Sequence, residues 1–524
     1  MTERFNLTSW FVDRNLDEGR GDRVALLCGD RRVTYAELAV LSNRAGHVLR
    51  DLGVRQEERV LLALSDGIEF VAIWYAAQKI GAVTAEVYSF LKAKDFRYYL
   101  DYTRAGVVVV DATTLESMRE ARAALADRPW PGTLLAVGVS VEQLRDGEAS
   151  FDALVAEAPD ALDPAPTAPD DIAIWKFTTG STGTPKACVH RAETPLRSFQ
   201  HYAQGVLGIR EDDVVLPVPK LFFGYARDLA ALYPFGVGGA GIVFPERSTP
   251  ERIFELVERH RPTILVNVPT MMRAMLDRPD HDLSCLRLCT SAGEALPEDL
   301  HRRWLEVFEA EVLDGIGSSE AYHIYISNRP GSARPGTLGQ VVPGYSARVV
   351  DDGGRDLPDG ETGRLWIEGD TTALMYWNAR EKSLATYAGD VVMSGDIFTR
   401  DADGYFRYRG RADDLLKVGG IWVAPQEIEQ CLAGHPDVAE CAVVGYEEDG
   451  LVKPRAYVVL HDGAMVDAAA LQAHVKGALS PHKYPRDVRF VAELPRTGSG
   501  KVDRQALRKL GARERAGAAG PVDR

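Results

Sequence analysis

The sequence predicts an α/β protein with mostly parallel, buried sheets. Amphipathic helical segments alternate with short, wholly apolar segments rich in β-branched residues. Residues 107–110, 264–268 and 442–444 are of the second kind, which is typical of strands covered on both faces. After about residue 340 the pattern changes to short strands separated by turn signals such as Asp352-Gly353-Gly354. We therefore expect a large N-terminal domain of layered α/β subdomains plus a β-rich subdomain, followed by a small α+β C-terminal domain.

Three segments can be assigned from local signals. Thr34-Tyr35-Ala36-Glu37 is a capping box that opens a helix, the apolar stripe of that helix runs from Leu38 to Leu49, and Gly53 ends it. A second helix is expected after Pro297, with one apolar face made of Leu300, Trp304, Leu305 and Phe308. Residues 156–171 are rich in Pro, Ala and Asp and should form a surface linker before a strand.

Composition narrows the class of protein. The chain of 524 residues has 61 Lys and Arg against 76 Asp and Glu, a formal net charge of −15, and 45% hydrophobic residues. It can therefore bury a core, and its negative charge argues against a nucleic-acid partner. Its six cysteines form no CxxC pair, as expected for free thiols in a reducing cytoplasm.

No membrane or export segment is expected. The first residues contain charges and no apolar segment of the signal-peptide type. The longest uncharged segment, from Leu229 to Pro245, is interrupted by Pro234 and several glycines and is too short to span a bilayer. We therefore expect a cytoplasmic protein with no membrane partner.

The most informative segment is Phe177-Thr-Thr-Gly-Ser-Thr-Gly-Thr-Pro-Lys186. Its glycines allow close approach of the backbone, its hydroxyls donate hydrogen bonds and its lysine supplies charge, which suits a polyphosphate. The P-loop pattern is excluded because Ala187, rather than Ser or Thr, follows Lys186. The alternative is a flexible loop without a ligand. The candidate phosphate-binding residues are Thr178, Thr179, Ser181, Thr182, Thr184 and Lys186.

This segment resembles the signature loop of the acyl-adenylate-forming enzymes, the superfamily of AMP-dependent synthetases and ligases. Further segments similar to the motifs of that family follow in the same order: residues 291–297, 314–320, 394–396 with Gly410-Arg411, and 495–501. The resemblance covers nearly the whole chain, and five motifs in one order form a specific signal. It implies ATP and Mg²⁺ as cofactors.

The resemblance also implies roles for individual residues. The third motif would hold the α-phosphate through Ser319 and Mg²⁺ through Glu320, and Asp396 with Arg411 would bind the ribose. Lys501 would be catalytic, bridging the attacking carboxylate and the α-phosphate in an in-line displacement. Taken singly, such residues are usually solvated; their ordered occurrence reverses that expectation. The remaining nucleotide contacts implied are Ser291, Ala292, Gly293, Glu294, Asp314, Gly315 and Ile316.

The family implies a mobile small domain. Residues 1–412 would form the large domain and residues 413–524 the small one, which rotates about a hinge at Asp413 between the two half-reactions. Lys417, Gly419 and Gly420 would then meet coenzyme A, and residues 483–486 would help to bind its phosphates. The alternatives are an ordinary acidic surface turn at residue 413 and an ordinary basic turn at residues 483–486.

Residues 220–225, 313–331 and 375–382 are most similar to the benzoate-CoA ligase branch. By that likeness His323 would donate to the substrate carboxylate, although a core histidine beside Tyr322 is the alternative. Where that branch usually has Gly-Leu-Gly-Asn, this chain has Ala226-Arg227-Asp228-Leu229. Arg227 either pairs with Asp228 and points away, or lies in the pocket and contacts a polar ring substituent. The flat aryl pocket implied consists of Gly224, Tyr225, Gly317, His323 and Ile324.

The function expected is ATP-dependent activation of a substituted benzoate-type acid to aryl-AMP, followed by transfer to coenzyme A with release of AMP and pyrophosphate. The alternative acceptors are a carrier-protein thiol, an amine or a small inorganic nucleophile. A nucleotide-binding regulator without activity is disfavoured, because Glu320, Asp396 and Lys501 are all present. The enzyme is expected to be a monomer or a homodimer. The sequence leaves open the ring substituents, the acceptor and the pathway.

Overall fold

The computed structural model describes residues 4–125, 130–179, 184–412, 416–418, 421–448, 451–480, 483–496 and 502–518. The chain forms two compact units, one of residues 1–347 with 367–393, the other of residues 348–366 with 394–524. The second unit thus includes residues 394–412, which the sequence assigned to the large domain. A functional hinge at residue 413 remains a prediction, because that residue lies outside the described ranges.

The first unit is built on two large sheets. The nine-stranded sheet has the order β16-β15-β14-β13-β12-β10-β11-β1-β2, and the eight-stranded sheet has the order β19-β9-β8-β4-β3-β5-β6-β7. The strands of the first are β1 (Val24–Cys28), β2 (Arg31–Thr34), β10 (Val214–Pro217), β11 (Ala240–Ile242), β12 (Ile264–Asn267), β13 (Leu288–Ser291), β14 (Val312–Gly317), β15 (Ile324–Ser327) and β16 (Gln340–Val341). Those of the second are β3 (Arg59–Ala63), β4 (Val83–Glu86), β5 (Val107–Asp111), β6 (Thr133–Val137), β7 (Glu148–Ser150), β8 (Ile172–Thr179), β9 (Pro185–Arg191) and β19 (Met375–Tyr376).

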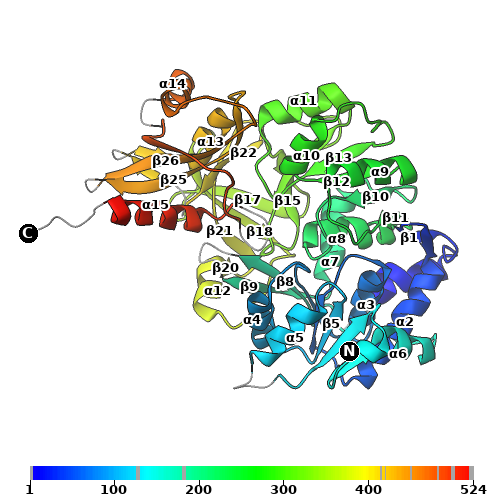
Figure 1. Cartoon of the computed structure of the whole chain (residues 1–524). Coiled ribbons are helices and arrows are strands. Elements are labelled where there is room, and N and C mark those ends of the chain that lie inside the picture. Colours follow the sequence, from blue (N-terminus) through cyan, green and yellow to red (C-terminus); the bar gives the residue numbers. More distant parts are fainter. Residues whose placement is uncertain are drawn as a thin grey trace, which may run out of the picture. The chain divides into compact units, whose positions relative to one another are not determined.

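Helices form three layers around these sheets. Helices α2 (Tyr35–Asp51), α3 (Ile68–Lys79) and α8 (Gly224–Ala231) share one core with a face of each sheet. Helices α9 (Pro250–His260), α10 (Pro269–Leu276) and α11 (Glu298–Phe308) cover the other face of the nine-stranded sheet. Helices α4 (Ala93–Thr103) and α5 (Leu115–Ala123) cover the other face of the eight-stranded sheet (Figure 1). The short helices are η1 (Ser9–Asp13), α1 (Arg14–Asp17), η2 (Val141–Gln143), α6 (Phe151–Glu157), α7 (Thr194–Ser198), η3 (Phe199–Gln204), η4 (Pro234–Gly236) and α12 (Arg380–Thr386).

A five-stranded sheet includes strands from the β-rich part of the sequence. It consists of β17 (Tyr345–Val350), β18 (Thr362–Gly369), β21 (Val391–Arg400), β20 (Tyr387–Ala388) and β22 (Phe406–Arg411). The second unit contains the hairpin β23 (Leu416–Val418) and β24 (Ile421–Val423), and a three-stranded sheet of β25 (Val438–Glu448), β26 (Leu451–Leu460) and β27 (Asp487–Phe490). Helices α13 (Pro425–Ala433) and α14 (Ala468–Ala478) cover one face of that sheet, and α15 (Arg504–Ala518) covers the other.

The local predictions are confirmed. Thr34 accepts from the Glu37 backbone N–H and the Glu37 carboxylate accepts from that of Thr34, which closes the capping box. The helix expected after Pro297 is α11. In β12, Leu265 packs into one core while Ile264 and Val266 pack into another, so the strand is covered on both faces. The six cysteines form no disulfide with one another. A separate finding is that no helix in the described ranges is long and apolar enough to cross a membrane.

Candidate active site

The strands that flank the predicted phosphate loop form an antiparallel hairpin. Thr178 of β8 pairs with Lys186 of β9, and Thr179 pairs with Pro185. Ser181 and Thr182 lie outside the described residues, while Thr184, which directly precedes β9, is exposed. Lys186 is half-buried, and desolvation lowers its pKa against the opposing charge of Glu320. The structure therefore places Lys186, the predicted phosphate-binding lysine, close enough to Glu320, the predicted metal ligand, for their charges to interact.

Glu320 is held by a tyrosine that the sequence analysis did not single out. The Tyr376 hydroxyl donates to Glu320 Oε1 at 2.6 Å, and the Ala373 N–H donates to the Glu320 carbonyl at 2.8 Å. Tyr376 pairs with Cys188 of β9 in the sheet, so the edge strand β19 aligns its hydroxyl with the carboxylate. Tyr376 lies within the segment that resembles the benzoate-CoA ligases, but only its contact with Glu320 indicates a role.

The donor set of this region fits Mg²⁺. In the described parts of the chain, no group of three His, Cys, Asp or Glu side chains is arranged to hold a metal. Mg²⁺ usually retains waters and binds one or two protein carboxylates together with substrate phosphates. Glu320 is thus suited to supply the protein ligand, with the remaining positions taken by phosphate oxygens and water.

The segment around Glu320 is attached to the β8–β9 hairpin. The His190 ring contacts the Ser319 carbonyl through Nε2 at 2.7 Å, and the Ser319 hydroxyl donates to the Phe177 carbonyl at 3.3 Å. Burial lowers the pKa of His190 to about 3, so its ring is neutral and Nε2 donates. Ser319, predicted to hold the α-phosphate, therefore lies directly beside the strand that leads into the phosphate loop.

The predicted adenine segment and the next motif lie on neighbouring parallel strands. Ser291, at the end of β13, is in register with Asp314 of β14, and both are buried. Burial raises the pKa of the Asp314 carboxyl, while the Ser291 hydroxyl and the Gly315 N–H oppose that shift. Ala292 is buried, Gly293 has a φ of +86°, and the exposed Glu294 accepts hydrogen bonds from Thr270.

The antiparallel pair β14–β15 brings most of the predicted aryl pocket together. Gly317 is in register with Ile324, and a Cβ on Gly317 would lie 2.3 Å from the His323 carbonyl oxygen. A Cβ on Gly315 would lie 2.8 Å from the Ile326 carbonyl oxygen. Glycine is therefore required at both positions by the close approach of β15, and Ile316 lies between them on β14.

His323 lies among three tyrosine rings. It is 3% exposed, with centroid distances of 5.4 Å to Tyr202, 5.8 Å to Tyr225 and 5.1 Å to Tyr233. Desolvation lowers its pKa to about 3, so the ring is neutral at physiological pH. Nε2 lies 3.4 Å from the Tyr225 carbonyl, which can only accept, so Nε2 carries the proton and Nδ1 is left as an acceptor. Donation to a substrate carboxylate would need the other tautomer, and this role remains a prediction.

Gly224 and Tyr225 form the first turn of α8, and the Tyr225 hydroxyl is 2.7 Å from Thr290 Oγ1. Two residues further on, Arg227 pairs with Asp228 at 2.7 Å and with Glu86 at 2.8 Å. Arg227 is 2% exposed. Of the two alternatives for Arg227, the structure shows the ion pair with Asp228. The guanidinium group lies within the core. Contact of Arg227 with a polar ring substituent stays a prediction.

In the second unit, the two predicted ribose-binding residues face each other. Asp396 of β21 is in register with Arg411 of β22, and their side chains are 3.6 Å apart. The Asp396 N–H donates to Ser394 Oγ at 3.1 Å. A carboxylate held in this way can accept from two adjacent hydroxyls.

The other predicted residues of the C-terminal part are less fully described. Gly419, Gly420 and Lys501 lie outside the described residues, and Lys417 lies in β23, although its side chain is not described. Lys483 pairs with Glu427, and the Arg486 guanidinium lies 3.8 Å from the Tyr484 ring centroid. These contacts fit both alternatives for residues 483–486, so contact with coenzyme A stays a prediction.

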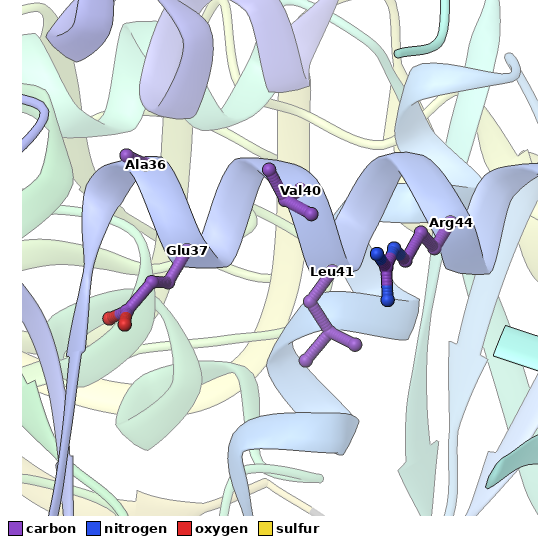
Figure 2. Close-up of a pocket in the computed structure, with 5 residues that line it drawn as sticks. All are labelled: Ala36, Glu37, Val40, Leu41 and Arg44. Carbon is purple, nitrogen blue, oxygen red and sulfur yellow. The ribbon is translucent and has the colours of Figure 1, made fainter. Parts of the chain in front are cut away.

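A hollow of about 310 Å³ lies along α2 (Figure 2). Arg44 on this face pairs with Asp160. No predicted site residue belongs to it, because it is lined by Ala36, Glu37, Val40, Leu41 and Arg44.

Comparison with known families decides the assignment. The model of the AMP-binding enzyme matches residues 12–377, and the model of the AMP-binding enzyme C-terminal domain matches residues 427–501. This chain belongs to the AMP-binding enzyme family. These two matches include four of the five motifs; the remaining one, residues 394–396 with Gly410-Arg411, lies between them.

Similar proteins cover the whole length of the chain. It is 42% identical to the benzoate–CoA ligase of Thauera aromatica over 97% of this chain and 96% of that protein. It is 39% identical to the 4-hydroxybenzoate–CoA/benzoate–CoA ligase of Rhodopseudomonas palustris, over 97% of this chain and 94% of that protein. Among solved structures, a benzoate CoA ligase from Burkholderia xenovorans LB400 matches with a TM-score of 0.87 and 38% identity, covering 96% of this chain and 100% of that one.

Proposed function

We propose that this protein is an AMP-forming aryl-CoA ligase. It activates an aromatic carboxylic acid with ATP to an aryl-AMP and transfers the aryl group to coenzyme A, releasing pyrophosphate and AMP. The observation that carries the proposal is the continuous segment from β14 to β15. Its middle carries Ser319 and Glu320, while Gly317, His323 and Ile324 flank them. Residues suited to an α-phosphate and residues suited to an aromatic acid are thus only a few positions apart. Similarity to two ligases of benzoate and hydroxybenzoate supports the same assignment.

The residues divide the chemistry between them. The acid carboxylate attacks the α-phosphorus and pyrophosphate leaves, so negative charge must be neutralised throughout the reaction. Lys186 supplies positive charge to the phosphates, and Lys501 bridges the attacking carboxylate and the α-phosphate. Mg²⁺, when bound, spreads the charge of the leaving pyrophosphate. Glu320 would hold that ion, and Tyr376 fixes the Glu320 carboxylate.

Binding of the substrates is assigned to the remaining residues. Asp396 accepts from the ribose hydroxyls with Arg411 beside it. The Tyr225 and His323 rings provide flat apolar surface for an aryl ring. Lys417, Gly419 and Gly420 are assigned to binding of the pantetheine arm, and Asp413 is assigned as the hinge used between the two half-reactions. The enzyme works in the cytoplasm as a monomer or a homodimer.

Mass spectrometry of the reaction products tests this function. The protein is incubated with ATP, Mg²⁺ and a panel of benzoates and cinnamates, each with and without coenzyme A. We expect an aryl-CoA mass that appears only when coenzyme A is present. Accumulation of aryl-AMP that coenzyme A does not change would overturn the assignment of the acceptor. It would direct the search to a carrier-protein thiol, an amine or an inorganic nucleophile. Absence of any aryl-AMP would refute aromatic acid activation.

A further inference from the structure

Four ionisable side chains, two of them on helix α8, are buried together. Lys176 is 5% exposed, Glu86 4%, Arg227 2% and Asp228 0%. These residues, here named the buried ion cluster, contain two cations and two anions and are formally neutral as a group. Burial of charge is costly unless each charge is paired. Adenylation as described above uses none of the four, so their presence calls for another explanation.

Lys176 is the centre of this cluster. Its ammonium donates to Asp228 Oδ2 at 2.6 Å and to the Tyr322 carbonyl at 2.8 Å. It also lies 3.4 Å from the centroid of the Tyr322 ring, within the range of a cation–π interaction. One side chain on β8 thereby connects the strand that leads into the phosphate loop, the helix that carries Tyr225, and the turn that precedes His323.

The first turn of α8 is shaped around this lysine. A Cβ on Gly224 would lie 2.4 Å from Lys176 Nζ and 2.6 Å from its Cε. The lysine cannot easily move aside, because Asp228 and Tyr322 hold its ammonium group. Gly224, which resemblance assigns to the aryl pocket, is therefore in direct contact with the lysine.

The turn at Tyr322 is the second point that Lys176 supports. Tyr322 has a φ of +72°, a left-handed conformation that L residues adopt only when their surroundings impose it. Besides the two contacts with Lys176, the Tyr322 hydroxyl accepts from Arg227 Nη2 at 3.4 Å. Arg227 is held in turn by Glu86, whose Oε1 also accepts from Trp74 Nε1 at 2.5 Å. His323 follows this turn directly, so its ring position depends on the conformation of Tyr322.

We propose that Lys176 is a positioning residue for the aromatic acid: by holding Asp228 and the left-handed turn at Tyr322, it sets the spacing between Tyr225 on α8 and His323. The inference rests on the proposed function, since it needs an aromatic acid bound beside these rings. Lys176 itself touches no reacting atom. Its loss is expected to affect binding of the acid much more than binding of ATP.

The test compares the variants Lys176→Met and Lys176→Met/Asp228→Asn with the full-length wild-type enzyme. Lys176→Met leaves an excess of buried negative charge, so its melting temperature should fall. In the double variant the buried ion cluster is neutral again, so most of the lost melting temperature should be recovered. In both, the KM for the acid should rise by about tenfold or more, since a small misplacement of binding groups is enough for such a loss. The KM for ATP should change by less than about threefold, because the ammonium of Lys176 holds Asp228 and Tyr322 and no predicted ATP-binding residue, so no such misplacement is expected there.

Recovery of the acid KM together with the melting temperature in the double variant would show that Lys176 acts only on stability, and would overturn the proposal. An unchanged acid KM in Lys176→Met would do the same. Failure of the proposed function looks different, because the wild-type protein itself would then form no aryl-AMP.

A measurement on the wild-type enzyme remains decisive if neither variant folds. Burial lowers the pKa of Lys176 to about 8, against the opposing charge of Asp228. The other titratable or charged groups that face it are Arg227, Glu86, Tyr322, the thiol of Cys188 across the β8–β9 pair, and the neutral rings of His190 and His323. Above pH 8 the ammonium loses its charge and its cation–π contact, so the KM for the acid should rise with pH while the KM for ATP stays level. A flat acid KM between pH 7 and pH 9.5 would contradict the inference. In Lys176→Met, if it folds, the rise should be absent.

Discussion

Replacement of Tyr376 by Phe isolates one hydrogen bond at the predicted metal ligand. The Tyr376 hydroxyl donates to Glu320 Oε1 at 2.6 Å, and the tyrosine is 8% exposed. Burial and the nearby Glu320 charge raise the pKa of Tyr376, so the hydroxyl remains a donor at any working pH. A hydrogen bond to a charged group contributes about 1.5–3 kcal/mol. If that energy orients Glu320 toward Mg²⁺, its loss should weaken the apparent Mg²⁺ affinity by roughly 10- to 100-fold, as seen when outer-shell partners of metal ligands are removed.

Pyrophosphate release, followed as a function of Mg²⁺ concentration at saturating ATP and acid, measures this effect. Tyr376→Phe should shift the half-saturating Mg²⁺ concentration upward with a smaller change in the rate at saturating Mg²⁺. Tyr387→Phe is the matched control, because its ring lies 5.1 Å from that of Tyr376 but its hydroxyl contacts Cys188 Sγ at 3.7 Å. An unchanged Mg²⁺ dependence in Tyr376→Phe, or an equal shift in both variants, would refute the reasoning.

Three further outcomes are expected. Lys501→Ala should reduce aryl-AMP formation by orders of magnitude while equilibrium dialysis still detects ATP binding; unchanged adenylation would refute the assigned role. His301 is buried and desolvation lowers its pKa from 6.5 to about 4. The unfolded chain therefore takes up the extra proton as pH falls from 6.5 to 4, and the folded state loses up to about 1.4 kcal/mol of stability per pH unit. His301→Leu should flatten part of that dependence in melting curves at pH 7 and pH 5, and a parallel fall in both proteins would contradict this. Thr34→Ala removes the capping box of α2 and should destabilise the protein by about 1 kcal/mol in urea titrations, with kinetics like those of the wild type; no loss of stability would show that the cap contributes little.

The sequence was a good guide where structure depends on neighbouring residues. The capping box at Thr34 and the apolar face of α11 could be predicted because helix signals repeat within one or two turns. The uninterrupted β-branched segments at β5 and β12 likewise indicated doubly covered strands. The order of the five motifs indicated the family, and the family models match residues 12–377 and 427–501.

The position of the polar side chains in the core was harder to predict. Arg227 had two interpretations from sequence, and only the tertiary structure shows that Glu86 and Asp228 both pair with it. The burial of Lys176 could not be predicted from sequence, because a single lysine in a strand is usually solvated. In the structure it is buried and holds a turn 146 residues away.

The amino-acid sequence by itself therefore determined the fold class and the family, and it predicted the residue types expected to bind ATP, since these depend on short motifs and local periodicity. The tertiary structure alone decided how those residues are held. Tyr376 reaches Glu320 across 56 residues, and Lys176 reaches Asp228 across 52. Such pairs depend on which strands become neighbours and on how completely the sheets exclude water. Burial then makes each hydrogen bond to a charge strong enough to fix a side chain, and no local pattern in the sequence encodes that condition.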